Sequence, residues 1–217
     1  DAKVQNAGWN PYTTRPDDAR LVPLRDAGWA TMPGRETPTI YPPATELIYR
    51  LTWRVLPNPA GFKLPFLLAD LLVVFLLAWW TRAASGRNFQ LAIYAWNPLV
   101  VIEFAASGHN DSLAILGVVG ALLIIRRRPV VSTLLITAAT LAKVFPGALL
   151  PLWLRKAGWP QKARGWAAAV GAALLAAALA WPYRSAWPGV LDSFAYFESR
   201  WQNYHASLYT VLTWFSG

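Results

Sequence analysis

The stretch that organises the chain is residues 97–111, which read NPLVVIEFAASGHND. It begins inside an apolar run and ends in a polar segment, Gly108–Asp111, before the next apolar run starts at Leu113. Four of its side chains are costly to bury in hydrocarbon, and these are Asn97, Glu103, His109 and Asp111. Ionisable residues at membrane depth are costly and are read as functional by default. The sequence therefore predicts a polar site within a membrane protein, with the rest of the chain forming the membrane-embedded helices around it.

The composition supports a membrane protein. The chain is 55% hydrophobic and 14% charged, whereas a soluble domain has about 25% charged residues. Its 13 tryptophans suit the membrane–water interface, where an apolar ring with a polar N–H is favoured. The net charge of +9 falls in short basic clusters between apolar runs, which is the pattern of cytoplasmic loops. We therefore expect the lipid bilayer as a partner and no nucleic acid.

The pattern predicts an all-α fold, a multi-pass transmembrane helical bundle with an extracytoplasmic first loop. Residues 1–44 are polar and rich in proline, with a short helix expected over 19–26, capped by Asp17 or Asp18. Residues 45–217 form the transmembrane helical domain, which we expect to be incomplete at both ends. The segments expected to be helical are an amphipathic one over 44–56 and apolar ones over 64–81, 89–106, 113–125, 130–154 and 166–181.

The basic clusters at 82–87, 126–128 and 155–164 set the orientation, because basic loops stay in the cytoplasm. Residues 1–44, 107–111 and 182–202 then lie outside. Residues 130–154 must consequently enter and return, with a break near Lys143–Gly147, where Pro146 interrupts a helix. The alternative is a single kinked span, which leaves four basic residues outside. We favour the broken hairpin.

Several polar side chains in these segments have two possible roles each, one structural and one functional. His109 or Asn110 caps the next helix, with Asp111 in its first turn, or else His109 and Asp111 bind a phosphate or sugar hydroxyl. Glu103 is either a site residue or the partner of Lys143 or an arginine. Lys143 is a charge partner of Glu103 or Asp70, or a phosphate contact, and we interpret Asp70 as structural. Asn97-Pro98 is typical of a helix kink that an asparagine side chain satisfies. Arg200 is either a bidentate phosphate ligand or a solvated arginine.

A series of short motifs resembles one family. In order they are residues 1–12 (DAKVQNAGWNPY), 39–43 (TIYPP), Trp96-Asn97-Pro98 with Glu103, Gly108–Asp111, Lys143 with Pro146, Trp201 with Asn203, and Ser207-Leu208-Tyr209. Together they resemble the bacterial multi-pass glycosyltransferases of the GT-C fold. The closest resemblance is to the glycosyltransferase 87 and polyprenyl-phosphate-mannose-dependent mannosyltransferase group, over nearly the whole chain.

The resemblance implies an inverting transfer of a sugar, expected to be mannose, from polyprenyl phosphate to a glycolipid or glycan acceptor. The resemblance also implies that the reaction takes place on the outer face of the bacterial plasma membrane. A carboxylate in the first loop takes the acceptor proton, and basic groups stabilise the leaving phosphate. Members of the family often carry an aspartate a few residues upstream of the position of Asp1, and Asp1 corresponds to the last acidic residue of that motif. Asp1 is therefore the catalytic candidate in this chain, and the true base is expected before it. This chain alone is expected to be inactive.

The candidate substrate-binding residues are Tyr41, Glu103, His109, Asp111, Lys143, Arg200 and Asn203. No metal ligands are assigned among them, no cofactor beyond the donor is expected with certainty, and dependence on a divalent metal stays open. The alternative function is a flippase or transporter for a lipid-linked sugar. Such proteins more often show two similar halves, and the sequence shows none. A membrane scaffold without activity does not account for the ionisable residues together.

Overall fold

The computed structural model describes residues 1–32, 34–84 and 89–189, and every regular element in these ranges is a helix. The predicted all-α class is confirmed for this part of the chain. The chain divides into two compact units. One comprises Asp1–Trp9 and Tyr41–Arg184, and the other comprises Asn10–Ile40 and Ser185–Gly217. The division at residue 44 that the sequence suggests stays a prediction.

The described part of the second unit contains two 3₁₀ helices, η1 (Ala19–Leu24) and η2 (Ala27–Thr31). The expected cap of η1 is confirmed as Asp18, whose carboxylate accepts from the Arg20 backbone N–H at 2.9 Å. The Trp29 ring binds two guanidinium groups, those of Arg25 at 3.9 Å and Arg35 at 4.7 Å from its centroid. This cation–π arrangement stabilises a segment that has little other regular structure.

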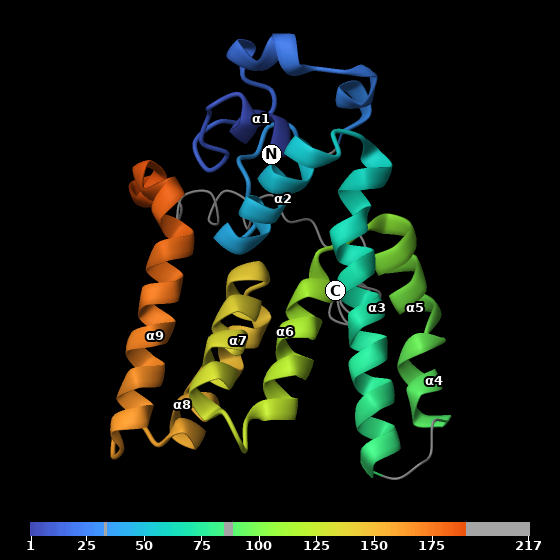
Figure 1. Cartoon of the computed structure of the whole chain (residues 1–217). Helices are drawn as coiled ribbons and strands as arrows, with labels where there is room; N and C mark the ends of the chain where they lie inside the picture. The colour runs from blue at the N-terminus through green and yellow to red at the C-terminus, as the bar shows by residue number, and fades with distance from the viewer. Residues whose placement is uncertain (33, 85–88, 190–217) are drawn as a thin grey trace, which may run out of the picture. The chain divides into compact units, whose positions relative to one another are not determined.

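The first unit holds the remaining helices. They are α1 (Ala2–Asn6), α2 (Pro43–Val55), α3 (Pro59–Ala84), α4 (Phe89–Ala95), α5 (Pro98–Val100), the π-helix η3 (Val101–Ser107), α6 (Asp111–Ile124), α7 (Pro129–Ala142), the 3₁₀ helix η4 (Phe145–Leu149), α8 (Leu150–Ala157), α9 (Ala163–Ala180) and the 3₁₀ helix η5 (Trp181–Gly189), which continues into the second unit. Helices α4, α3, α6, α7 and α9 follow one another across Figure 1, and α8 packs against α7 and α9.

Two stretches are long and apolar enough to cross a membrane, Pro59–Ala83 and Ala163–Trp187. Only 22% and 17% of their most apolar windows are buried, so their side chains mostly face outward. A core helix of a soluble protein would instead be buried on most sides. The helices α6 and α7 are also apolar but shorter.

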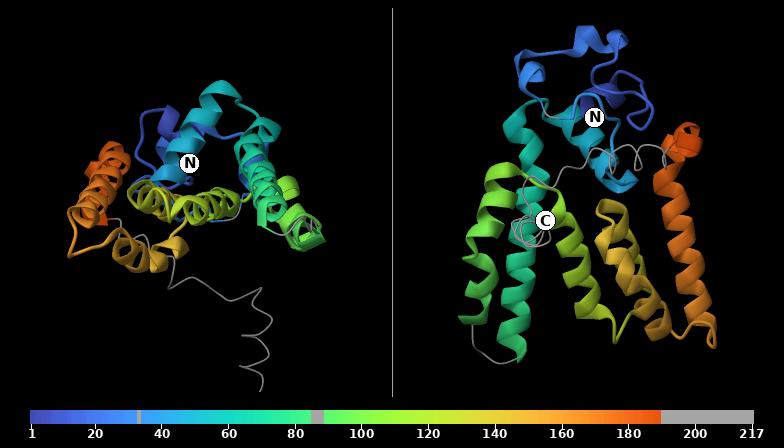
Figure 2. Two further views of the ribbon diagram at one scale, coloured as in Figure 1. Left: turned by 60° about the horizontal axis from the view of Figure 1, so that its bottom comes forward. Right: turned by 180° about the vertical axis from the view of Figure 1, so that it is seen from behind.

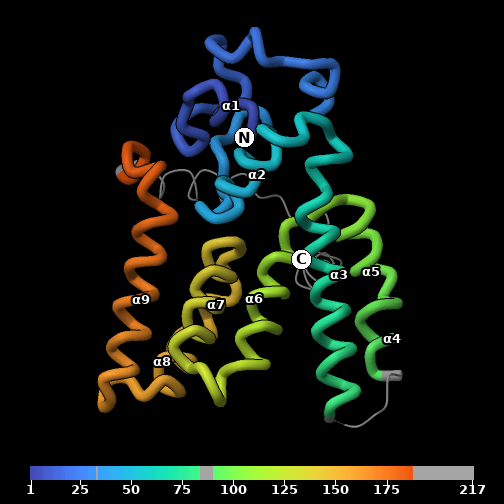
Figure 3. Tube along the Cα trace, in the orientation of Figure 1, coloured from blue at the N-terminus to red at the C-terminus, as the bar shows by residue number. Residues whose placement is uncertain are grey.

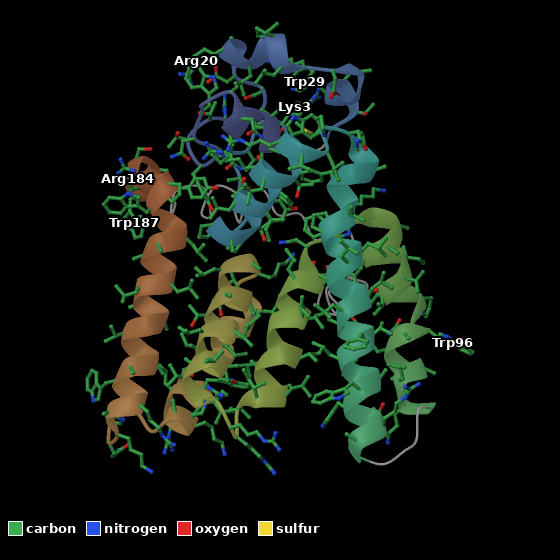
Figure 4. All side chains as sticks on the ribbon, in the orientation of Figure 1. Lys3, Arg20, Trp29, Trp96, Arg184 and Trp187 are labelled. Atoms are coloured by element: carbon green, nitrogen blue, oxygen red, sulfur yellow. The ribbon has the colours of Figure 1, made fainter. Side chains whose placement is uncertain are left out.

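The single helix expected over 89–106 is wrong in detail, because the chain breaks at Asn97. The Asn97 side chain accepts from the Leu99 backbone N–H at 3.0 Å, so the expected kink satisfied by asparagine is confirmed. Trp96 before the break is 84% exposed and projects away from the helices in Figure 4. After α5 the chain continues as the π-helix η3, and Gly108 ends it at a φ of 76°.

The chain reverses after α7, as the broken hairpin predicts. Trp153 in α8 donates from Nε1 to Ser132 Oγ near the start of α7, at 2.7 Å. Ser132 in turn donates to the Ala121 carbonyl of α6 at 2.7 Å. Ala121, Ile136 and Trp153 form one buried cluster. Figure 3 shows α8 beside the lower part of α7, next to the start of α9. A single span over 130–154 is therefore wrong.

The ends of the helices segregate by charge. The end of α3, the α6–α7 turn, the end of α8 and the start of α9 lie at one end of the first unit in Figure 1 and in the right-hand view of Figure 2. These termini carry the basic residues Arg82, Arg126, Arg127, Arg128, Arg155, Lys156, Lys162 and Arg164. Helices α1 and α2 lie at the other end. The basic clusters that the sequence places on one side of a membrane therefore share one end of the unit.

Candidate active site

Asp111 and Lys143 form an ion pair where α6 begins and α7 has just ended. Lys143 Nζ lies 3.1 Å from Asp111 Oδ2 and donates to Asn110 Oδ1 at 3.4 Å. The two side chains are 34% and 32% exposed, so the pair is accessible to a ligand. They meet because α6 and α7 run antiparallel from a common turn, and each has 14 residues. The sequence offered Glu103 or Asp70 as the charge partner of Lys143, and the structure corrects the partner to Asp111. The other interpretation of Lys143, a phosphate contact, stays a prediction.

A buried network behind this pair holds it in place. Asn110 is 2% exposed, and its amide donates to Thr45 Oγ1 and to the Ala142 carbonyl, each at 3.1 Å. Thr45 also donates to the Ala142 carbonyl at 2.7 Å. One asparagine thus joins α2, α6 and the end of α7. The suggestion that its side chain caps α6 is wrong, because it makes no capping hydrogen bond.

Glu103 and His109 form a second pair at the left-handed turn of Gly108. His109 Nδ1 lies 2.7 Å from Glu103 Oε2, and the His109 backbone N–H donates to the Glu103 carbonyl at 2.9 Å. The side chain of His109 is 51% exposed and that of Glu103 is 38% exposed. Lys63, which the sequence did not single out, packs its stem over Gly108 and donates to the Ala106 carbonyl. The expected partner of Glu103, Lys143 or an arginine, is corrected to His109.

Asp70 lies apart from both pairs and is structural, as interpreted from the sequence. It is 8% exposed and accepts from the Tyr94 hydroxyl at 2.8 Å, which ties α3 to α4. The Tyr94 hydroxyl supplies a hydrogen bond of the kind that a buried carboxylate requires.

Tyr41 belongs to an aromatic cluster beside the Asp111 carboxylate. Its ring meets Tyr49 edge to face, with centroids 5.4 Å apart, and Tyr49 packs on Phe66 in the same manner. Burial raises the pKa of the Tyr41 hydroxyl, its hydrogen bond with Tyr49 opposes the rise, and the Glu46 and Asp111 carboxylates raise the pKa further. The Tyr41 hydroxyl is therefore protonated at neutral pH and can donate a hydrogen bond.

Asp1 precedes α1, which lies against α2. Ala2 is buried in one cluster with Tyr49 and Phe66, and Tyr41 packs against that cluster. The described polar residue that sequence reasoning missed here is Glu46, which is fully buried and hydrogen-bonded to Gln5. The available signal was the four-residue spacing of Glu46, Arg50 and Arg54 within the segment 44–56, which the sequence predicts only to be amphipathic.

The structure thus brings Tyr41, Asp111 and Lys143 into one neighbourhood, with Glu103 and His109 as a separate pair. Arg200 and Asn203 lie outside the described residues. Among residues 1–32, 34–84 and 89–189, no group of three or more histidines and carboxylates is placed to hold a metal ion.

Residues 1–158 match the family model described as alpha-(1->6)-mannopyranosyltransferase, N-terminal domain. The chain belongs to this mannosyltransferase family. The resemblance to mannosyltransferases is therefore confirmed, and a glycosyltransferase that acts on mannose is supported. The match runs from α1 to the end of α8, so both charge pairs of the mannosyltransferase lie within the matched domain. No curated protein and no solved structure matches the chain.

Proposed function

We propose that this mannosyltransferase is a multi-pass membrane enzyme with a GT-C-like bundle and an extracytoplasmic first loop. It moves mannose from polyprenyl phosphate to a glycolipid or glycan acceptor on the outer face of the bacterial plasma membrane. The observation that carries the proposal is the accessible Asp111–Lys143 ion pair, built between two short apolar helices in a mannosyltransferase domain.

The depth of this pair supports a site sunk in the membrane. Helices α6 and α7 have 14 residues each, which corresponds to about 21 Å, whereas the hydrocarbon core is about 30 Å thick. If their common turn at Arg126–Arg128 lies at the cytoplasmic surface, Asp111 and Lys143 lie below the outer surface. Charges at that depth are costly and mark substrate sites in membrane proteins.

The orientation is open to direct measurement. The 217 residues contain no cysteine, so a single introduced cysteine reports its own accessibility once any cysteine outside them is removed. We expect an impermeant maleimide to label Thr37→Cys in intact cells and Lys156→Cys only after permeabilisation. The reverse pattern, or equal labelling, contradicts the proposed topology.

The proposed reaction is a direct displacement at the mannose C1. An acceptor hydroxyl oxygen forms the new bond to C1 while the bond from C1 to the phosphate oxygen breaks, and polyprenyl phosphate leaves with the electron pair. A carboxylate, Asp1 or one upstream of it, takes the hydroxyl proton. Lys143 and His109 stabilise the negative charge that grows on the phosphate. Hydrogen bonds to the sugar or acceptor come from Tyr41, Glu103 and Asp111, and Arg200 and Asn203 complete the proposed set.

The family description adds an α-(1→6) linkage, which we include in the proposal for this enzyme. An inverting displacement that yields an α linkage requires mannose that is β-linked to phosphate in the donor. The anomer of the donor therefore tests the mechanism separately from the activity.

The experiment uses membranes that carry the full-length protein and radiolabelled polyprenyl-phosphate mannose in each anomeric form. We expect transfer to a lipid or glycan acceptor from the β anomer alone. We expect Lys143→Met to lower the rate at least about tenfold, because an electrostatic contact to a leaving group is typically worth this much or more. The matched control is Lys156→Met, an exposed lysine at the basic end, which should keep the wild-type rate.

Two outcomes contradict the proposal. Intact donor recovered on the opposite leaflet, without transfer to any acceptor, indicates a flippase instead. Wild-type turnover in both Asp111→Asn and His109→Ala returns these residues to a structural role.

A further inference from the structure

Helix α1 is too short to define its own position. It has five residues, and isolated helices below about 12 residues are marginal in water. Its place in the first unit must therefore come from contacts with other elements. Those contacts decide where Asp1 lies, because Asp1 is the residue before α1, and its carbonyl accepts from the Gln5 backbone N–H at 3.0 Å.

The main contact is between Gln5 and the buried carboxylate of Glu46. The Gln5 amide donates both to Glu46 Oε2 and to the Glu46 backbone carbonyl, the latter at 3.0 Å. The Gln5 side-chain oxygen accepts from the Tyr183 hydroxyl at 2.8 Å. All three residues are buried, and Glu46 is 0% exposed. A hydrogen bond to a charged acceptor in such surroundings is stronger than a neutral one.

Further contacts continue along α2 at the same four-residue spacing. Asn6 donates to the Arg50 carbonyl at 3.1 Å, and Arg54 Nε donates to Asn6 Oδ1 at 2.8 Å. Lys3 lies over the Trp53 ring, with Nζ 5.2 Å from its centroid (Figure 4 labels Lys3). The side chains of Glu46, Arg50 and Arg54 form a polar stripe on α2, and α1 packs against this stripe. Of these three charged side chains, Glu46 alone is fully buried.

We propose that Glu46 is a positioning residue of the active site. Its carboxylate holds Gln5, and through α1 it sets Asp1, and the chain that leads into Asp1, relative to Tyr41 and the Asp111–Lys143 pair. This inference rests on the proposed function. Glu46 itself does not touch substrate, because its side chain is enclosed.

The test uses the full-length protein and β-linked polyprenyl-phosphate mannose. Glu46→Gln keeps the shape of the side chain and removes its charge. We expect kcat to fall by about tenfold to a hundredfold, since small displacements of reacting groups cost this much, with a change in donor KM below about twofold. The reciprocal double variant, Gln5→Glu with Glu46→Gln, restores an amide–carboxylate pair and should recover at least about threefold of the lost kcat. Glu36→Gln is the matched control and keeps the wild-type kcat.

A second readout does not depend on activity. Trypsin should cleave after Lys3 faster in Glu46→Gln than in the wild type, because α1 is released from α2. An active wild type with unchanged kcat in Glu46→Gln overturns the inference, as does an unchanged cleavage rate after Lys3. A double variant no more active than Glu46→Gln also overturns it, because the charge at position 46 then matters rather than the contact. A wild type without transfer in any form overturns the proposed function and the inference that rests on it.

Discussion

Replacing Asn110 by alanine tests whether the Asp111–Lys143 pair depends on the network behind it. The change removes two donated hydrogen bonds, to Thr45 and to the Ala142 carbonyl, and also the oxygen that accepts from Lys143 at 3.4 Å. Each neutral hydrogen bond contributes about 1 kcal/mol net to the free energy of unfolding. The cavity left at this buried site, where Asn110 is 2% exposed, costs at most about 1 kcal/mol more. The expected loss is therefore about 2–3 kcal/mol in the free energy of unfolding.

The loss is measured as the Tm of detergent-solubilised protein. For a chain of 217 residues, 1 kcal/mol corresponds to about 2–4 °C, so Asn110→Ala should lower Tm by about 4–12 °C. Gln161→Ala, an exposed polar truncation, is the control and should change Tm by no more than about 2 °C.

The double variant Asn110→Ala with Thr45→Val tests whether the two residues act through the same hydrogen bond. Thr45→Val removes the hydroxyl that both accepts from Asn110 and donates to Ala142. Since the bond between Thr45 and Asn110 can be lost only once, the double variant should be less destabilised than the sum of the two single variants, by about 1 kcal/mol. Strict additivity, or an unchanged Tm in Asn110→Ala, would refute the network as the support of the pair.

Three further predictions concern other parts of the structure. Gly108→Ala should cost about 1–2 kcal/mol, because an alanine at a φ of 76° is strained and its Cβ would meet Lys63 Cγ at 2.8 Å; an unchanged Tm argues against this turn. Trp153→Phe removes the bond to Ser132 and should lower Tm by about 2–6 °C, whereas no change means that α8 is not held to α7 by this contact. The hydrogen bond from the Arg20 side chain lowers the pKa of Asp18 from 3.8 to about 2. The stability that this hydrogen bond contributes is therefore present above about pH 4 and is lost as the pH falls towards 2. Tryptophan fluorescence of Asp18→Asn should lack this acid transition, and an identical titration contradicts the assignment.

The sequence predicted the fold well where the physical signal is local. Apolar runs marked α3 and α9, Asn97-Pro98 marked a kink, and the basic clusters required the chain to reverse between α7 and α8. Each of these features depends on side chains within one or two turns of a helix, or on a rule that counts charges. The reversal was predictable because the alternative left a basic cluster on the wrong side.

The pairings within the site were not predictable in the same way. Lys143 pairs with Asp111 instead of Glu103, because the choice depends on where two antiparallel helices end relative to each other. Glu103 reaches His109 through the π-helix and the left-handed Gly108, a local geometry that helical spacing does not anticipate. Glu46 was hidden in a regular polar stripe, since amphipathic spacing does not distinguish a solvated face from one covered by another helix.

For the multi-pass membrane enzyme that we propose, the short length of α6 and α7 has a consequence for how the protein enters a bilayer. Neither helix reaches the roughly 20 residues that an independent span requires, and the end opposite their common turn carries Asn110, Asp111 and Lys143. Neither helix would be stable if inserted alone, because its polar end would remain in hydrocarbon without a partner. We expect the translocation machinery to release the two together as a preformed hairpin, with α3 and α9 integrated independently. Insertion would then be the step at which the charged pair first forms.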